Sequence, residues 1–125
     1  MSTKNKKLFG VWMDSHNATI VGNEEGVNEE FIVLGHVIND GADKNSNEKN
    51  LNNQEISLTL KFFKEIASKM PNIDEIHITG TGQVQEQFIK FLAETPQYKN
   101  VISTESTSNK MSDENLALFI MKHFN

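Results

Sequence analysis

The alternation of apolar and polar residues predicts strands in the first third of the chain. Apolar segments at 8–13 and 18–21 are separated by the turn-forming residues 14–17, and a third extended segment covers 27–37. Connections this short make neighbouring strands antiparallel. We therefore expect a three-stranded meander over residues 8–37.

A helical period replaces this alternation over residues 54–70, and Pro71 ends it. The repeating apolar residues are Ile56, Leu60, Phe63, Ala67 and Met70, widened by Leu58, Phe62 and Ile66. A stripe this wide is typical of a helix that packs on a core. A last helix is expected after Ser112, a good amino-terminal cap, with Leu116, Phe119, Ile120 and Phe124 on its buried face.

Between these helices lies the stretch around which the chain is organised, residues 74–88. Ile76 and Ile78 alternate with polar neighbours, as a strand requires, and two glycines then allow a sharp turn. Val84, Phe88, Phe91 and Leu92 follow at helical spacing, which predicts a helix that Pro96 ends. A short fifth strand is expected at 101–103.

The predicted order is β-β-β-α-β-α-β-α, which indicates an α/β fold of three layers with one mixed sheet and helices on its faces. This order matches the ribonuclease-H-like layout. With 125 residues the chain is one domain, expected over 8–125 after a flexible basic tail at 1–7.

A polar segment interrupts the pattern before the first helix. Residues 39–53 are rich in Asn, Asp, Lys and Glu, and Leu51 is almost their sole apolar member. Such a composition cannot bury enough surface to order itself, so we expect a mobile loop at 39–54. It is either an insertion without a role or a loop that orders on a partner.

Composition narrows the function classes. The net charge is −5, which disfavours general nucleic-acid binding. The chain has no Cys and no apolar run of ~20 residues, and the basic start lacks the apolar segment of a secretory signal. We expect a cytoplasmic protein that does not enter membranes, in an oligomeric state that the sequence leaves open.

Candidate chemistry is sparse. Asp14 follows the first strand and could be a metal ligand of a nuclease, but it also suits a turn in which it binds its own backbone. Gly80, Thr81 and Gly82 precede a helix and form a possible anion-binding turn, although a tight packing turn explains them equally. The four His residues share no ligand spacing, so we expect no metal and no cofactor.

Three segments carry a resemblance to a known family. They are Asp14-x-x-x-Ala18-Thr19-Ile20, then the polar loop that runs into a helix, then Gly80-x-Gly82-x-x-x-Glu86-x-Phe88. In this order they resemble the middle domain of archaeal and eukaryotic peptide-chain release factors and of the ribosome-rescue protein Pelota. The resemblance spans roughly residues 8–124, and the chain looks like a stand-alone, bacterial-type relative.

In release factors this loop carries Gly-Gly-Gln, which helps water attack the peptidyl-tRNA ester. Here the equivalent residues are Asn52, Asn53 and Gln54. The resemblance implies a binding loop at these residues, with the ribosome, its rRNA or tRNA as partner. It also offers Gln54 as a catalytic residue, but the loss of both glycines favours binding without hydrolysis. The alternatives are peptidyl-tRNA hydrolysis by Gln54, or a protein-interaction module unrelated to the ribosome.

Overall fold

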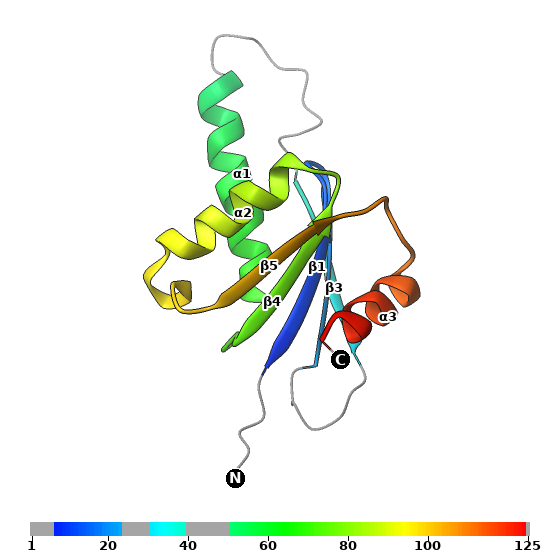
Figure 1. The fold of residues 1–125 in the computed structure, drawn as a ribbon. Coiled ribbons are helices and arrows are strands. Elements are labelled where there is room, and N and C mark those ends of the chain that lie inside the picture. The colour runs from blue at the N-terminus through cyan, green and yellow to red at the C-terminus, as the bar shows by residue number, and fades with distance from the viewer. Residues whose placement is uncertain (1–6, 24–30, 40–50, 125) are drawn as a thin grey trace.

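A five-stranded mixed sheet forms the middle layer of the computed structural model, in the order β3-β2-β1-β4-β5. The structure describes residues 7–23, 31–39 and 51–124, with the side chains of α1 described from Leu58 onward. The strands are β1 Leu8–Met13, β2 Asn17–Asn23, β3 Ile32–Ile38, β4 Glu75–Gly80 and β5 Ile102–Thr107. The helices are α1 Leu51–Ser68, α2 Gln83–Glu94, the short 3-10 helix η3 Pro96–Tyr98 and α3 Asp113–Phe124 (Figure 1).

The pairing confirms the predicted fold class. β1, β2 and β3 form an antiparallel meander, whereas β4 runs parallel to β1 and β5 parallel to β4. The fourth strand therefore lies beside the first. β3 begins at Ile32, and residues 27–30 of the predicted strand lie outside the described residues. β5 extends to Thr107, because its Ser and Thr side chains are compatible with an edge strand.

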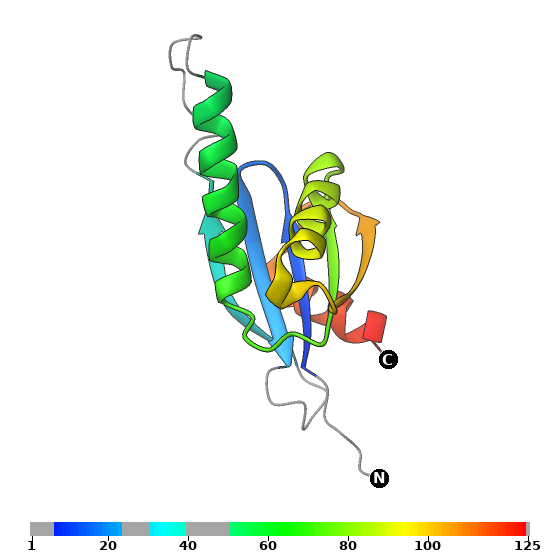
Figure 2. The ribbon, with the colours of Figure 1, turned by 90° about the vertical axis from the view of Figure 1, so that its left-hand side faces the viewer.

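Two apolar clusters lie on the two faces of the sheet. α1 and α2 cover one face and α3 covers the other (Figure 2). The cluster under α1 and α2 includes Phe9, Val11, Ile20, Phe62, Phe63, Ile66, Ile76, Ile78, Phe88 and Leu92. The cluster under α3 consists of Trp12, Val21, Phe31, Leu116 and Ile120, with half-buried neighbours around it. Both sheet faces are thus apolar, as a three-layer fold requires.

Helix α1 begins at Leu51, three residues before the predicted start at 54. Its amino-terminal part projects beyond the end of the sheet (Figures 1 and 2). The prediction that Leu60 is buried with the rest of the stripe is wrong, since its side chain is 43% exposed. Leu60 lines a pocket between α1 and α2 instead of reaching the sheet.

The ends of the remaining elements follow the predicted local chemistry. Ser112 caps α3, because its hydroxyl accepts the Asn115 N–H at 3.1 Å. Asp113 and Glu114 lie in the first turn, where the helix dipole favours anions. The Lys7 N–H donates to the Asp74 carboxylate at 2.7 Å, which ties the start of β1 to the start of β4. None of the described helices is long and apolar enough to span a membrane.

Candidate functional site

The parallel pairing of β1 with β4 brings two turns to the same end of the sheet. Met13 is the partner of Gly80, so the chain leaves both strands side by side. The amino-terminal end of α1 projects from the molecule at this end (Figures 1 and 2). The 14–17 turn, the 80–82 turn and the start of α1 therefore share one edge, which we call the loop edge.

Asp14 organises the first of these turns. Its carboxylate Oδ1 accepts the backbone N–H groups of His16 at 2.8 Å and of Asn17 at 2.7 Å. Its own N–H donates to the Asn17 carbonyl at 2.9 Å. Asp14 is thus the backbone-binding turn residue that its sequence context allowed. In the part of the chain that the structure describes, no three His, Asp or Glu side chains gather as metal ligands would.

Asn39 joins the end of β3 to this turn. It is 6% exposed, its N–H donates to the His16 carbonyl at 2.8 Å, and its side-chain amide donates to the Ser15 carbonyl at 3.0 Å. The point at which the chain enters residues 40–50 is therefore held by two hydrogen bonds. In the sequence, Asn39 is one more polar residue of an Asn-rich segment, so its role could not be predicted.

The 80–82 turn is tight. A Cβ at Gly80 would overlap the Met13 carbonyl, and Gly82 has a φ of 146°, which favours glycine. Gln85 is fully buried below the turn: its Oε1 accepts the Gly82 N–H at 2.7 Å, and its Nε2 donates to the Ser106 carbonyl at 2.8 Å. A side-chain amide thus satisfies the Gly82 N–H. Anion binding by Gly80, Thr81 and Gly82 stays a prediction.

Asn52, Asn53 and Gln54 belong to the first turn of α1, at its projecting end (Figure 1). Their side chains lie outside the described part of the structure, as do residues 40–50 of the predicted mobile loop. The roles of Asn52 and Asn53 in binding and of Gln54 in catalysis therefore stay predictions.

A second polar cluster lies on the α3 face of the sheet, around His77 of β4. His77 is 3% exposed; its Nδ1 lies 2.7 Å from the Thr104 hydroxyl and its Nε2 2.9 Å from the Ser106 hydroxyl. The ring of His123 in α3 stacks on the His77 ring, with 3.9 Å between the centroids. The cluster continues through Thr79, whose hydroxyl lies 2.9 Å from the hydroxyl of Ser106.

The hydrogen bonds of this cluster run in one direction. Ser106 has a single hydroxyl proton, which it donates to Thr79, so it must accept the Nε2–H of His77. The Nδ1 of a neutral His77 then accepts from Thr104. Burial and the neighbouring His123 lower the pKa of His77 to about 4. His77 is thus a neutral residue that fixes β5 and α3, which the isolated histidines of the sequence did not reveal.

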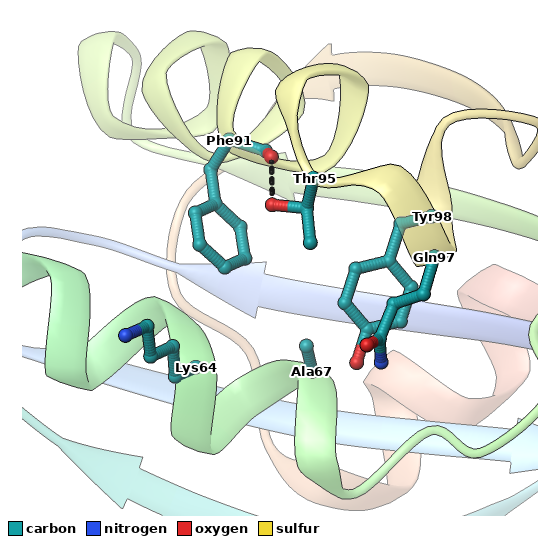
Figure 3. A pocket seen from close by; sticks show the side chains of 6 residues that line it. All are labelled: Lys64, Ala67, Phe91, Thr95, Gln97 and Tyr98. Carbon is teal, nitrogen blue, oxygen red and sulfur yellow. Dashed lines mark hydrogen bonds between the residues drawn. The ribbon is translucent and has the colours of Figure 1, made fainter.

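The cleft between α1 and α2 holds an open pocket of about 230 Å³. Lys64 and Ala67 of α1 line one side, and Phe91 and Thr95 line the other, with Gln97 and Tyr98 at one end (Figure 3). It lies on the face opposite α3 and is separate from the His77 cluster. Of the lining residues, Ala67 belongs to the apolar stripe of α1 and Phe91 to the apolar residues predicted for α2, so the sequence indicated a core at these two positions and no pocket.

Comparison with solved structures shows what this arrangement is similar to. In fold, the chain resembles Pelota and an archaeal release factor. The Pelota protein of Thermoplasma acidophilum superposes with a TM-score of 0.60 at 20% identity, covering 91% of this chain and 31% of that one. Pelota of Archaeoglobus fulgidus gives 0.60 at 14% identity, covering 96% and 32%. The archaeal translation termination factor aRF1 gives 0.58 at 12% identity, covering 95% and 35%.

This likeness confirms the fold that the resemblance implied. The chain spans about a third of the length of each of these proteins. No family model and no curated protein matches the sequence. At these identities the likeness establishes the fold alone.

Proposed function

We propose that the chain is a translation-associated domain that binds the ribosome, as the middle domain of a release or rescue factor does. The observation that carries this proposal is the likeness of the whole fold to Pelota and to the termination factor aRF1. The order of the elements supports it, because a polar segment leads into the first helix both in this chain and in the release-factor middle domain that it resembles. Function follows the site and not the fold, so the loop edge is where the proposal has to be tested.

The loop edge projects from the molecule and is therefore accessible to a large partner. Helix α1 projects beyond the sheet, and Asn39 holds the other end of the 40–50 segment with two hydrogen bonds (Figure 1). Because α1 and Asn39 fix its two ends, residues 40–50 would contact one defined region of the ribosome. Asn52, Asn53 and Gln54 lie in the first turn of α1, at its projecting end (Figure 1).

Binding without hydrolysis is the form of this function that the residues favour. Release factors carry two glycines where this chain has Asn52 and Asn53. Glycine adopts backbone angles that are costly for other residues, although Asn tolerates the left-handed region better than most. Here both residues fall within the helical backbone of α1. Gln54 alone would then have to direct water, without the backbone freedom that precedes it in the family.

Co-sedimentation with purified ribosomes tests the proposal. The unmodified chain is compared with a variant in which residues 40–50 are replaced by a Gly/Ser linker of equal length, so that the entropy of loop closure changes little. A second variant carries Asn52→Ala, Asn53→Ala and Gln54→Ala. We expect both changes to abolish pelleting, while Lys122→Ala on α3 leaves it intact. Equal recovery of all four proteins in the ribosome pellet, or in the supernatant, contradicts the proposal.

A further inference from the structure

A continuous groove runs between α1 and α2, on the sheet face opposite α3. The pocket of about 230 Å³ adjoins a second one of about 340 Å³, and both are lined by Phe91 and Thr95. The second pocket is lined further by Leu60, Phe63, Gln87, Lys90 and Glu94. The two pockets therefore share these two residues, and Figure 3 shows both of them in the first pocket.

Apolar side chains of both helices contribute to the lining of the groove. The ring centroids of Phe63 in α1 and Phe91 in α2 are 5.6 Å apart, so the two rings are in contact and join the helices there. The Thr95 hydroxyl donates to the Phe91 carbonyl at 2.7 Å, so its proton is already used (Figure 3). Leu60, 43% exposed, extends the apolar surface along α1. Leu60 thus adds exposed apolar surface beside the second pocket, and concave sites with apolar walls and a few polar groups are where ligands bind.

The charged side chains that line the groove indicate the charge of the partner that it binds. Lys64 of α1 and Lys90 of α2 line the two pockets from opposite helices, with Glu94 as the one carboxylate among the lining residues. Among the described residues, neither lysine has a carboxylate within ion-pair distance. Two lysines and one glutamate give the groove lining a formal charge of +1, on a protein whose net charge is −5. Two lysines are too few to neutralise a nucleic-acid backbone, so an acidic peptide fits better.

We propose that this groove binds a short acidic peptide segment of a partner protein, which inserts one apolar side chain into each pocket. In a helical peptide, side chains three or four residues apart lie about 5–6 Å from each other on one face, which suits two pockets that share lining residues. Carboxylates beside these anchors then meet Lys64 and Lys90. The loop edge takes no part in this interaction, so it stands independently of ribosome binding.

Selection from a phage library of random 12-residue peptides on the full-length chain supplies the probe. The inference predicts selected sequences with two large apolar residues three or four positions apart and flanking Asp or Glu. A fluorescein-labelled copy of the most enriched peptide is then titrated with the chain by fluorescence anisotropy. We expect Lys64→Glu and Lys90→Glu to weaken binding about fivefold each, because attraction becomes repulsion. We expect Leu60→Gln to weaken it as well.

The matched control is Lys61→Glu, a charge reversal at another exposed lysine of α1 that does not line either pocket. It should change the affinity less than twofold. If Lys61→Glu and Lys64→Glu lowered the affinity for the peptide equally, the net charge of the protein would explain the effect and the inference would be overturned. So would selected peptides that lack acidic residues, or tighter binding of an oligouridine than of the peptide. Peptide-induced NMR shifts outside the backbone amides of residues 60–67 and 87–98 would overturn it too.

Discussion

Acid should destabilise this fold through His77, and the effect can be calculated. The structure lowers the pKa of this buried imidazole from 6.5 to about 4. The unfolded chain therefore binds a proton between these values that the folded chain does not. The contribution of His77 to stability is thus complete above the unfolded pKa and is lost as the pH falls from 6.5 toward 4. From these two values the loss between pH 7 and pH 5 is about 2 kcal/mol.

Other groups titrate over the same range, so the prediction is stated as a difference between two proteins. His77→Gln keeps a donor and an acceptor for Thr104 and Ser106 but carries no titrating group. The free energy of unfolding of both proteins is measured by urea denaturation, followed by circular dichroism, at pH 7, 6 and 5. The advantage of the wild type over the variant should shrink by about 2 kcal/mol across this range.

A second variant separates the two causes of the lowered pKa. His123→Gln removes the neighbouring imidazole but leaves His77 buried, so the pH-dependent loss should become smaller without vanishing. NMR titration of the His77 ring should give a midpoint near pH 4 in the wild type and a higher one in this variant. If the stabilities of the wild type and His77→Gln fall in parallel with pH, His77 takes up no proton on unfolding in this range and the prediction is wrong.

Three further predictions concern packing and the loop edge. A Cβ at Gly10 would overlap the side chain of Ile120, so Gly10→Ala should cost about 1–3 kcal/mol in urea denaturation, and clearly less in an Ile120→Ala background, where α3 has room for it. Gly80→Ala would meet the Met13 carbonyl, which no rotamer change relieves, so the loss should be about 3 kcal/mol or more in the same measurement; full stability would refute the tight turn. If Gln54 acts in hydrolysis after all, the unmodified chain releases peptide from stalled ribosomes and Gln54→Ala does not; we expect no release by either protein.

The sequence revealed most of the fold because the spacing of apolar residues within each segment indicates whether it forms a strand or a helix. The alternation around Ile76 and Ile78 and the helical stripe before Pro71 depend on neighbours within a few residues. The mixed sheet with helices on its faces was predicted from the order of the elements. Element ends were less accurate, as in β5, whose polar residues pair with β4 although they lack an apolar pattern.

The sites were harder to predict because they join distant parts of the chain. His77 and His123 are stacked in the structure but far apart in the sequence, so spacing could not reveal them. Leu60 belongs to an apolar stripe, but whether it reaches the sheet depends on where α2 lies. Gln85, a polar residue on a helix, is buried only because the Gly82 turn and β5 meet above it. In each case the deciding partner comes from another element.

Site-specific cross-linking shows whether the end of α1 contacts the ribosome, as proposed above. A photo-reactive benzoylphenylalanine is placed at position 54, at the projecting end, and in a control protein at position 122, in the last turn of α3. Both proteins are irradiated with purified ribosomes, and the rRNA is mapped by primer extension. We expect cross-links from position 54 to rRNA and none from position 122. Cross-links from position 54 that do not exceed those from position 122 would contradict it.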